Sequence, residues 1–504
     1  MPNAALPLWQ HSRSNPERPA LYGTADQEWS YRTLGGHVAR IAARLREAGI
    51  EPGDRVLLIA PTTPEFVAAY YAILSAGAVA VTANPMATAT ELRHIGTDAD
   101  IALVLCWHAA LPASAAVAAS LHVPCWTLSP GLAELSTGQP LSAPHGAADD
   151  DTAAIIYTSG TTGQPKGAQL THGNFTACAR IRQQVQELQP DERIGTALPL
   201  FHVYGQACIM GTTMLIGASL ALLPRFGAAE MLHLIRRHRL TVVAGVPTMW
   251  NAVVHAPAGD PEDFAGLRIA SSGGAPLPTE IKSALESRFG CTVLEGYGLT
   301  ETTGCATIQT ESRSGKPGSV GAPPPGCAIR IRTDDGAEQP SGTIGEIHVR
   351  GPVVMKGYWR RPEATAEVLR GGWFATGDLG FLDEDGDLHI VDRKKDMVIR
   401  GGYKVYSREV EEVLHEHPDI LEVAVIAVPD EHYGEEVGAV VVLRPGRAME
   451  GDELRTWAKE RLSAYKVPHL IAFAPDLPKN ATGKILKRTL DPSLFADART
   501  KARG

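Results

Sequence analysis

At residues 157–167 the chain has the sequence Tyr157-Thr-Ser-Gly-Thr-Thr-Gly-Gln-Pro-Lys-Gly167, directly after the apolar run 153–156. Its glycines can adopt positive φ, which lets backbone N–H groups converge on an anion. The stretch adds four hydroxyl donors and one charge: Thr158, Ser159, Thr161, Thr162 and Lys166. We therefore interpret it as a phosphate-binding loop rather than a polar turn. It is not a Walker loop, because no Gly-Lys-Ser/Thr triplet closes it.

Helices and strands are predicted to alternate on both sides of this loop. Apolar residues at helical spacing predict helices at 34–49 and 64–76. Continuous runs of Val, Ile, Leu and Ala predict strands at 55–60, 78–82, 101–105, 153–157, 219–223, 241–244 and 267–271. Because these runs lack polar alternation, we expect parallel strands that helices cover on both faces.

The pattern changes after Gly315. Short alternating runs at 329–332 and 345–350 predict a small antiparallel β-unit that extends to Ile390. After Arg393 a separate compact α/β unit is expected, with helices at 407–417 and 451–462 and strands at 422–428 and 438–443.

Composition limits the classes of protein that fit. The 504 residues carry a net charge of −9, with 44% hydrophobic and 20% charged residues, as in globular proteins of about three folding units. The 50 glycines and 36 prolines fit an enzyme rich in loops. The acidic balance argues against nucleic acid as the main partner, because phosphate neutralisation needs a surplus of Lys and Arg.

Features of other protein classes are missing from the sequence. Residues 1–8 show no secretory signal, and the longest apolar stretch, 214–223, is too short to span a bilayer. The seven cysteines form no CxxC or CxxH pair, so a zinc site is not expected. We interpret the cysteines as buried, reduced thiols. We therefore predict a cytoplasmic protein without an integral membrane segment.

The stretch at 157–167 resembles the signature of the adenylate-forming superfamily, which contains acyl- and aryl-CoA synthetases, luciferases and peptide-synthetase adenylation domains. Six further motifs match that family in its order: Pro199-Leu-Phe-His-Val-Tyr-Gly205, Ser272-Gly-Gly-Ala-Pro-Leu277, Gly296-Tyr-Gly-Leu-Thr-Glu-Thr-Thr303, Thr376-Gly-Asp-Leu-Gly380, Asp392-Arg-Lys-Lys-Asp396 and Asn480-Ala-Thr-Gly-Lys484. Each motif is weak alone, but seven in order are specific. The resemblance covers about residues 30 to 490 and is closest to fatty-acyl or aryl-CoA ligases.

The resemblance implies a two-step reaction. A carboxylate attacks the α-phosphate of ATP to give acyl-AMP and pyrophosphate, and a coenzyme A thiol then attacks the acyl carbon and releases AMP. The implied α/β fold has a large N-terminal adenylation domain at 1–394, with parallel sheets, helices and a small β-barrel. A small mobile α+β domain at 395–504 would rotate between the two steps about a hinge at Lys395.

The resemblance also assigns residues to the nucleotide and the metal. ATP or AMP would be bound by Thr158, Ser159, Gly160, Thr161, Thr162, Gly163, Lys166, Gly274, Ala275, Glu295, Tyr297, Asp378 and Arg393. Thr300 would contact the α-phosphate, and Glu301 would help to hold Mg²⁺, rather than being a surface carboxylate. Lys484 would reach between the attacking carboxylate and the α-phosphate. By residue type alone, Lys484 would usually be a solvated loop lysine and a Gly-Asp pair such as that at Asp378 a turn, so both assignments depend on the positions of these residues in the family motifs.

The acyl pocket implied by the resemblance contains small or apolar residues. His202 would lie over the reacting carboxylate and gate the thiol tunnel, although a packed structural histidine is a fair alternative. The pocket would be bounded by Gly205, Val246, Gly273, Gly296, Gly298 and Cys305. Similar enzymes that activate malonate carry Arg at the position of Gly296. Since a buried unpaired carboxylate is costly, we expect a monocarboxylic acid, fatty acyl first and aryl second.

The resemblance also implies residues for the second step. Gly401, Gly402, Tyr403 and Lys404 would line the coenzyme A channel. Where many CoA ligases have Asn-Val-Tyr-Pro, this chain has Lys404-Val-Tyr-Ser407; Lys404 could contact a CoA phosphate or mark a different acceptor. Ser407 suits a helix N-cap.

Three other functions stay open. The adenylate could pass to an amine, a carrier-protein thiol or another small nucleophile. A phosphoryl-transfer NTPase would instead release ADP, and a degenerate binding homologue would lack catalytic residues, yet Lys484, Glu301, Asp378 and Arg393 are all present. An oligomer is possible, but the sequence contains no coiled-coil heptads to support one.

Overall fold

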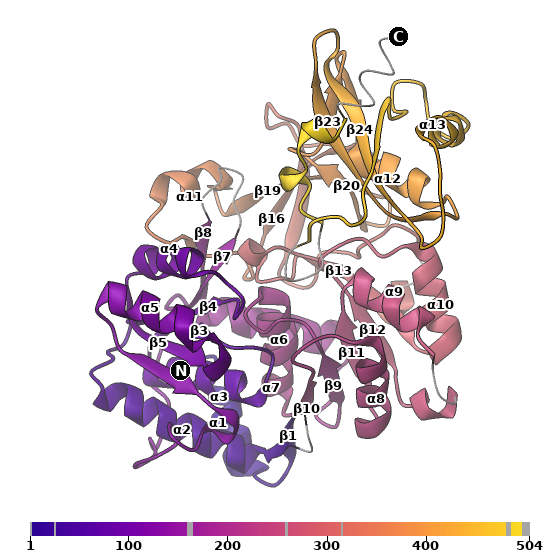
Figure 1. The fold of residues 1–504 in the computed structure, drawn as a ribbon. Coiled ribbons are helices and arrows are strands. Elements are labelled where there is room, and N and C mark those ends of the chain that lie inside the picture. Colours follow the sequence, from indigo (N-terminus) through magenta and orange to yellow (C-terminus); the bar gives the residue numbers. More distant parts are fainter. Residues whose placement is uncertain are drawn as a thin grey trace. The chain divides into compact units, whose positions relative to one another are not determined.

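The computed structural model of the chain describes residues 3–24, 27–158, 165–257, 261–313, 316–479 and 485–495 (Figure 1). The chain folds into two compact units. The N-terminal unit contains Met1–Ile329 and Val349–Phe374, and the C-terminal unit contains Arg330–His348 and Ala375–Gly504.

One sheet of the N-terminal unit carries the predicted phosphate-binding loop. Its seven strands lie in the order β17 (Gly357–Tyr358), β8 (Lys166–Thr171), β7 (Thr152–Thr158), β4 (Val79–Ala83), β3 (Arg55–Ile59), β5 (Ile101–Trp107) and β6 (Cys125–Leu128). The five strands from β7 to β6 run parallel, whereas β17 and β8 pair antiparallel. The apolar runs at 55–60, 78–82 and 101–105 therefore form the parallel strands that were predicted.

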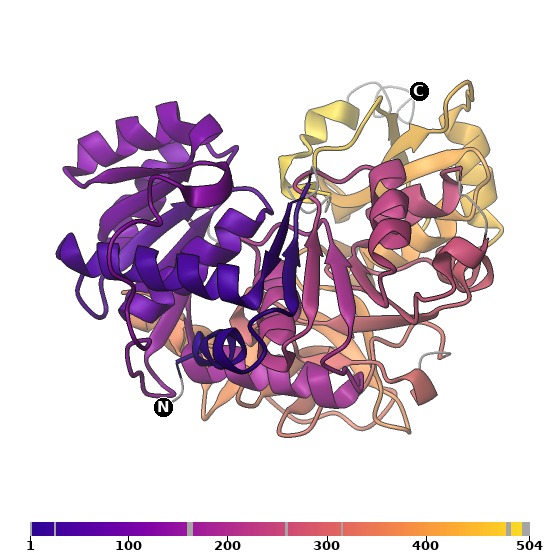
Figure 2. The ribbon, with the colours of Figure 1, turned by 90° about the horizontal axis from the view of Figure 1, so that it is seen from below.

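Both faces of this sheet are buried, as its uninterrupted apolar strands require. Leu57 and Ile59 of β3 pack with α4 (Ala89–Ala99) and α5 (Leu111–Leu121). Val56 and Leu58, which point to the other face, pack with α2 (Tyr31–Glu47) and α3 (Pro64–Ala76). Figure 2 shows this part of the chain from below. The alternation along β3 thus divides the apolar residues between two cores.

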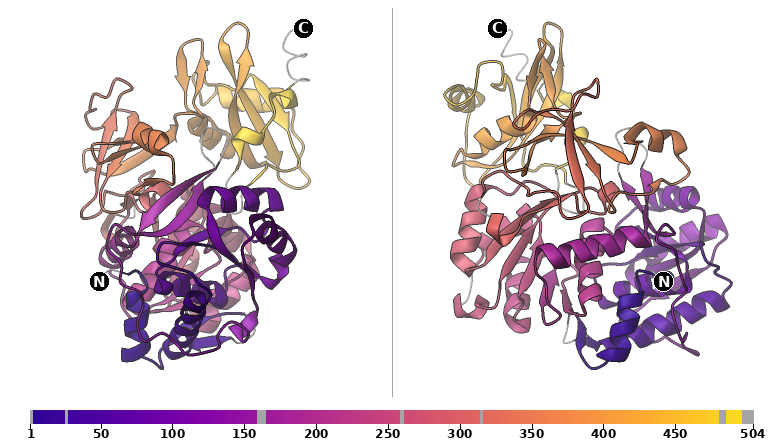
Figure 3. Two further views of the ribbon diagram at one scale, coloured as in Figure 1. Left: turned by 90° about the vertical axis from the view of Figure 1, so that its left-hand side faces the viewer. Right: turned by 180° about the vertical axis from the view of Figure 1, so that it is seen from behind.

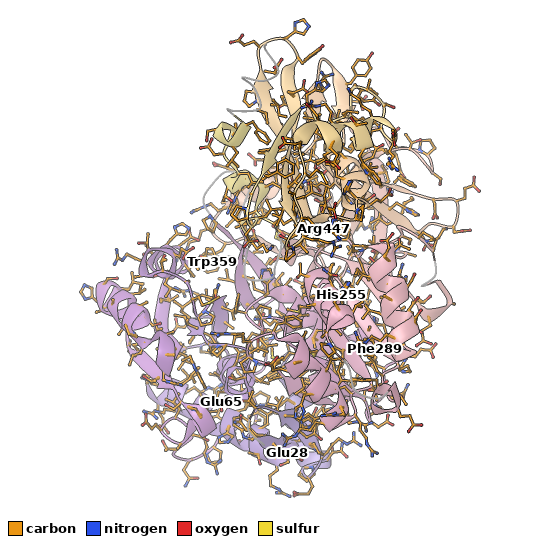
Figure 4. All side chains as sticks on the ribbon, turned by 45° about the vertical axis from the view of Figure 1, so that its right-hand side comes forward. Glu28, Glu65, His255, Phe289, Trp359 and Arg447 are labelled. Carbon is orange, nitrogen blue, oxygen red and sulfur yellow. The ribbon has the colours of Figure 1, made fainter. Side chains whose placement is uncertain are left out.

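The ends of these helices follow from local chemistry. The Ser30 side chain accepts a hydrogen bond from the Thr33 amide at 3.2 Å and caps α2. Pro64 occupies the first turn of α3, and Gly77, with φ +89°, ends that helix. Glu65, labelled in Figure 4, is buried but accepts hydrogen bonds from Gln27 Nε2 at 2.8 Å and from the Gly131 amide at 3.0 Å.

A second sheet of the same unit has eight strands. Their order is β14 (Thr307–Ile308), β13 (Thr292–Tyr297), β12 (Ile269–Ser272), β11 (Val242–Gly245), β9 (Arg193–Thr196), β10 (Ser219–Leu222), β1 (Pro19–Tyr22) and β2 (Glu28–Ser30). The strands from β13 to β1 are parallel. The loops after β9, β12 and β13 carry three of the family-like motifs, because the carboxyl ends of parallel strands meet at one edge of a sheet.

Helices cover both faces of this second sheet. On one face are α8 (Ala228–His238), α9 (Pro247–His255) and α10 (Thr279–Phe289). Phe289, labelled in Figure 4, packs edge-to-face on Phe264 with ring centroids 5.1 Å apart. The other face joins the larger core, to which α1 (Leu6–Ser14), α6 (His172–Val185), α7 (Thr212–Ile216) and the π-helix Tyr204–Gly211 also contribute.

A third sheet follows the point at which the sequence pattern changes. It runs in the order β15 (Ala328–Arg332), β16 (Gly345–Arg350), β19 (Trp373–Leu382) and β18 (Leu369–Arg370), with β20 (Leu388–Arg393) beside β19. The pairs β18–β19 and β19–β20 are antiparallel, as predicted. Helix α11 (Pro362–Val368) precedes β18.

The last sheet belongs to the C-terminal unit, drawn from two sides in Figure 3. Its order is β22 (Tyr403–Val405), β21 (Val398–Arg400), β24 (Gly434–Leu443) and β23 (Ile420–Asp430), with β25 (Leu470–Phe473) parallel to β24. One face packs on α12 (Ser407–His415) and α13 (Gly451–Lys459), and the other packs on residues that include Leu477 and Phe495.

The predicted α/β fold class is confirmed. The helices predicted at 407–417 and 451–462 end earlier in the structure, at His415 and Lys459, and strand β24 begins at Gly434 rather than at 438. Among the residues that the structure describes, none of the helices combines the length and the apolar character that crossing a bilayer requires.

Candidate active site

The predicted phosphate-binding loop joins two antiparallel strands. Strand β7 ends at Thr158 and β8 begins at Lys166, and these two residues are partners in the pairing. The hairpin therefore holds the two ends of the loop side by side. The predicted ligands Ser159, Gly160, Thr161, Thr162 and Gly163 lie outside the described residues.

Four side chains gather at the base of this loop, and we name them the Glu301 cluster: Thr158, Lys166, Glu301 and Tyr358. Glu301 Oε1 accepts hydrogen bonds from Tyr358 Oη at 2.9 Å and from Thr158 Oγ1 at 3.4 Å. Lys166 Nζ lies 5.4 Å from the centroid of the Tyr358 ring, within range of a cation–π interaction. The structure thus brings together three predicted site residues and adds Tyr358, which the sequence analysis missed.

The backbone around Glu301 fixes its position. Glu301 lies in the 3-10 helix Thr300–Thr302, and its carbonyl accepts a hydrogen bond from the Met355 amide at 2.8 Å. Both Thr300 and Glu301 are 8% exposed. Glu301 is therefore not the surface carboxylate that the sequence left as an alternative.

Tyr358 acts as a donor to Glu301. Burial raises the pKa of Tyr358, and the neighbouring Glu301 charge raises it further. The phenol therefore stays protonated near neutral pH and keeps its hydrogen bond to the carboxylate. This fixed carboxylate suits Mg²⁺, which takes one or two protein carboxylates and completes its shell with phosphate and water. No cluster of three His, Cys, Asp or Glu side chains able to hold a metal occurs among the described residues.

A second set of hydrogen bonds anchors the strands that carry the loop. Tyr157 Oη donates to Asp98 Oδ2 at 2.7 Å, and Arg361 pairs with Asp98 Oδ1 at 2.6 Å. Trp359, labelled in Figure 4, donates its indole N–H to the Asp98 carbonyl at 3.1 Å. Asp98 of α4 thereby links β7 to the segment that contains Tyr358.

The predicted adenine slot lies at the ends of β12 and β13. Gly274 has φ +82°, a conformation that favours glycine, and Ala275 beside it is exposed. Tyr297 is the last residue of β13 and is half-buried.

Glu295 has a structural role at the same place. Its carboxylate accepts a hydrogen bond from the Leu277 amide at 3.4 Å and lies 4.0 Å from Lys282 Nζ. Glu295 thus ties the loop after β12 to β13, which is sufficient to explain the residue without a nucleotide contact. Its assignment to ATP stays a prediction.

Backbone packing explains two glycines of the predicted acyl pocket. A Cβ on Gly205 would lie 2.6 Å from the Pro199 carbonyl oxygen, and one on Gly298 would lie 2.3 Å from the Gly304 carbonyl carbon. Both positions need glycine for close backbone approach. A Cβ on Gly296 would lie 3.1 Å from the Thr307 carbonyl oxygen, which is tight but less severe.

The other residues assigned to the pocket differ in exposure. Val246 and Gly273 are buried, and Cys305 is fully buried. His202 is half-buried rather than enclosed. Partial exposure of this kind is compatible with both the gating role and a packed structural histidine, so the choice between the two stays a prediction.

Two pairs of cysteines lie close together, which their spacing in the sequence did not indicate. The Sγ atoms of Cys106 and Cys125 are 3.7 Å apart, and so are those of Cys178 and Cys208. All seven cysteines are free thiols. Cys125 and Cys327 are half-buried, so the prediction that every cysteine is buried is wrong for these two. Cys125 lies in β6, the last strand of its sheet, and Cys327 directly precedes β15, and both pack against a core while keeping part of their surface exposed.

In the C-terminal unit, Asp378 and Arg393 are opposite each other. They are partners in the β19–β20 pairing, and Arg393 Nε lies 3.3 Å from Asp378 Oδ1. The Asp378 side chain is 6% exposed and that of Arg393 is 36% exposed. Asp378 lies inside β19 rather than in the turn that a Gly-Asp pair usually forms, and Thr376 Oγ1 on the same strand donates to the Ile347 carbonyl at 2.8 Å.

The residues assigned to the coenzyme A channel form a hairpin turn. Gly401 and Gly402 have φ +56° and +85° between β21 and β22, as a tight turn of this kind requires. Tyr403 is 62% exposed, its ring lies 5.0 Å from that of Tyr465, and Lys404 is exposed. Lys395, the predicted hinge, is exposed as well. Lys484 lies outside the described residues.

The prediction that Ser407 caps a helix is wrong. Tyr406 occupies the N-cap position, and Ser407 is the first residue of α12. Both the amide and the hydroxyl of Ser407 donate to Asp392, the hydroxyl at 3.1 Å, and the hydroxyl accepts a hydrogen bond from Lys487 Nζ at 2.7 Å. The Ser407 amide is therefore a hydrogen-bond donor to the buried Asp392 carboxylate. A proline at this position has no N–H group and could not make this bond.

We expect Ser407→Pro to destabilise the C-terminal unit. Burial already raises the pKa of Asp392, and the substitution removes two of its donors. The free energy of unfolding should fall by about 1–3 kcal/mol, the usual cost of leaving a buried acceptor unsatisfied. Urea unfolding of the full chain measures this change. Ser407→Ala is the matched control, because it keeps the amide, and equal stability of the two variants would contradict the role of the N–H group.

Comparison with known families identifies the chain. The model of the AMP-binding enzymes matches residues 8–359, and that of the AMP-binding enzyme C-terminal domain matches residues 409–484. The chain belongs to the AMP-binding enzymes. Within this adenylate-forming superfamily it is of the AMP-forming acid–thiol ligase, or acyl-CoA synthetase, kind.

Relatives of this AMP-binding enzyme match it over nearly their whole length. A feruloyl-CoA synthase of Amycolatopsis sp is 40% identical, with 97% of this chain and 98% of the relative covered. A long-chain-fatty-acid–CoA ligase of Bacillus subtilis is 36% identical, with 97% and 94% covered. The crystal structure of ATP-bound MatB from Rhodopseudomonas palustris is 34% identical and superposes with a TM-score of 0.93 over 99% of each chain.

Proposed function

We propose that this enzyme activates a monocarboxylic acid, aryl or fatty, and transfers it to coenzyme A. In the first step the acid's carboxylate oxygen bonds to the α-phosphorus of ATP, and the bond to pyrophosphate breaks. In the second step the thiolate of coenzyme A bonds to the acyl carbon, and AMP leaves as the acyl–phosphate bond breaks. The thiol proton goes to solvent.

The observation that carries this proposal is the Glu301 cluster at the base of the glycine-rich loop. A buried carboxylate, a hydroxyl and a lysine converge where the resemblance places the β- and γ-phosphates and Mg²⁺. Catalysis of an attack between two anions depends on oriented donors and cations of this kind. Mg²⁺, bound by Glu301 and the nucleotide, would neutralise phosphate charge.

The remaining roles follow the family resemblance. Asp378 would accept the ribose hydroxyls, and its ion pair with Arg393 already holds the carboxylate in place. Thr300 would contact the α-phosphate, Gly274, Ala275 and Tyr297 would bind the base, and His202 would face the reacting carboxylate. Gly401 to Lys404 would line the coenzyme A channel.

Domain rotation is part of the proposal. A C-terminal domain at 395–504 would turn about Lys395 on the N-terminal domain at 1–394, bringing Lys484 to the α-phosphate for the first step only. We also retain the cytoplasm as the predicted location of the enzyme.

Product analysis tests the proposed reaction. We expect ATP, Mg²⁺ and a suitable acid to yield pyrophosphate and enzyme-bound acyl-AMP, with AMP and the CoA thioester appearing when coenzyme A is added. Screening short, long and aromatic acids with and without coenzyme A measures this, with phosphate and ADP assayed in parallel as a control. Release of ADP instead of pyrophosphate would show a phosphoryl-transfer NTPase.

The same screen addresses the alternative acceptor. Lys404 and Ser407 depart from the pattern of many CoA ligases. This departure is the observation that supports an amine or a carrier-protein thiol as the alternative acceptor of the acyl group. Pyrophosphate release without a CoA thioester, for any acid tried, would favour that alternative.

A further inference from the structure

Helix α6 carries a buried arginine that has almost no partner for its charge. Arg182 of α6 is 5% exposed. Its Nη2 donates to Gln186 Oε1 at 3.0 Å, and its buried Nε has no hydrogen-bond partner. Within the described residues Arg182 forms no ion pair with a carboxylate, although a buried charge normally requires one.

The neighbours of this guanidinium place it next to residues assigned to the acyl pocket. Arg182 lies one helical turn after Cys178 on α6, and the Cys178 Sγ is 3.7 Å from the Cys208 Sγ, which in turn lies 3.4 Å from the Gly304 carbonyl oxygen, next to Cys305. Cys305 is one of the predicted pocket residues and is fully buried. A cation therefore stands beside a pocket that the sequence predicted to contain none.

Tyr204 continues the polar lining toward the substrate side. Its hydroxyl lies 3.1 Å from Ser271 Oγ, and its ring lies 3.3 Å from the position that a Cβ on Gly273 would occupy. Gly273 follows β12 directly and precedes the predicted adenine slot. Because Tyr204 lies one turn before Cys208 on the π-helix Tyr204–Gly211, it links the neighbourhood of Cys208 to the residues at which the acid is expected to react.

Burial lowers the pKa of Arg182, and the neighbouring groups among the described residues that raise it in compensation are three thiols and the Tyr204 phenol. The hydrogen bond from Cys178 lowers the pKa of Cys208, and the Arg182 charge lowers it further, while burial opposes both. A thiol is a weak acceptor, so the pair of cysteines leaves most of the five guanidinium N–H donors unused.

We propose that Arg182 binds an oxygen acceptor at the end of the acid remote from the reacting carboxylate. The substrate class is then an acid with a distal hydroxyl or carboxylate oxygen, not one with a purely hydrocarbon tail. This inference rests on the proposed function, because it names the substrate class of the same pocket. A second carboxylate in the acid is then no longer disfavoured. Position 296 is a glycine and offers no positive charge, but Arg182 supplies one.

A matched substrate series tests this assignment. The probes are cinnamic, 4-methylcinnamic, 4-hydroxycinnamic and 4-carboxycinnamic acids, together with hexanoic, 6-hydroxyhexanoic and adipic acids, and the readout is kcat/KM for pyrophosphate release. At least one oxygen-bearing acid should exceed its oxygen-free analogue by about 10- to 100-fold, the range expected for a hydrogen bond to a charged group. The hydroxyl and carboxylate members identify which oxygen is bound.

Variants separate substrate binding from a packing role. Arg182→Met should abolish the preference while activity toward the oxygen-free acid changes little, and Arg182→Lys should restore part of the preference. Arg180→Met is the control, because Arg180 lies on the same helix but is exposed. A packing role would lower activity toward all acids equally.

The outcomes distinguish this inference from the proposed function. Equal activity toward oxygen-bearing and oxygen-free acids in the unmodified enzyme overturns the role of Arg182 and leaves the CoA ligase function intact, even if Arg182→Met does not fold. A preference that survives Arg182→Met also overturns it. Absence of pyrophosphate release with every acid overturns the proposed function itself.

Discussion

Replacing Lys484 by Ala should reduce the rate of adenylation by about 10²–10³-fold or more, which is the loss expected when one preorganised donor to developing charge is removed. In the proposed first step an anionic carboxylate approaches an anionic α-phosphate. A flexible lysine can place a compact positive charge between the two. Pyrophosphate release in the presence of ATP, Mg²⁺ and the acid measures this rate.

The same variant should form the CoA thioester from supplied acyl-AMP at a rate close to that of the unmodified enzyme. In the second step the thiolate attacks a carbonyl carbon rather than a charged phosphate, and in the proposed rotation Lys484 has left the α-phosphate by then. Equal loss of both steps would contradict the assigned role and would point to a lysine needed for folding or for both conformations.

Lys479 provides the matched control for this prediction. It lies five residues before Lys484, and its Nζ pairs with Glu422 Oε2 at 2.8 Å and with Asp476 Oδ1 at 3.0 Å. Only Asp476 is well exposed in this group, at 75%, whereas Glu422 is 22% exposed, so Lys479→Ala should lower the stability of the C-terminal unit but leave the rates of both steps in the folded enzyme nearly unchanged. A comparable loss in Lys479→Ala would indicate that any charge removed from this segment disturbs adenylation.

The fold could be predicted from the sequence wherever burial on both faces leaves a continuous apolar run. Strand β3 was predicted within one residue and α3 at its observed bounds. The strand is buried on both faces of its sheet and the helix on all its sides, so each is a continuous apolar run in the sequence. Strand β8 was missed. Its sequence, Lys166-Gly-Ala-Gln-Leu-Thr171, mixes glycine and polar residues, and its place in the sheet comes from pairing with β7 and β17.

Contacts between distant segments account for the site residues that were missed. Tyr358 is 57 residues from Glu301, and the pairing of the short strand β17 with β8 brings the two together. No local pattern marks Tyr358. Arg182 does have such a signal, because it shares the buried face of α6 with Phe175 and Cys178 at spacings of seven and four residues. A charged residue on an apolar helical face is unusual enough to be noticed.

Ser407 shows how a correct local preference can be overridden. Serine is favoured at the N-cap position, but the helix begins one residue earlier than that preference implies. The reason lies outside the helix, in the buried carboxylate of Asp392, which takes the Ser407 amide and hydroxyl as donors. Tertiary hydrogen bonding of this kind cannot be derived from residue spacing.

Replacing Glu301 by Gln should raise the Mg²⁺ concentration needed for half-maximal adenylation and lower the maximal rate. Gln keeps the shape of the side chain and can still accept the hydrogen bond from Tyr358, but it loses the charge that Mg²⁺ prefers. Loss of a partner outside the metal's direct ligands already costs about 10- to 100-fold in affinity, so removal of a direct ligand should cost at least that. Titration of pyrophosphate release with Mg²⁺ at saturating ATP measures the shift.

Two further variants make the Glu301 prediction specific. Tyr358→Phe removes the donor at 2.9 Å but leaves the carboxylate, so its Mg²⁺ requirement should rise less than that of Glu301→Gln. Glu311→Gln is the control, since that carboxylate is 52% exposed and pairs with Arg268 at 2.7 Å, and we expect no change in its Mg²⁺ requirement. If Glu301→Gln lost activity at every Mg²⁺ concentration by the same factor, the carboxylate would serve to hold Tyr358 and Thr158 in place. The metal would then have to be bound by the nucleotide and by residues other than the Glu301 cluster.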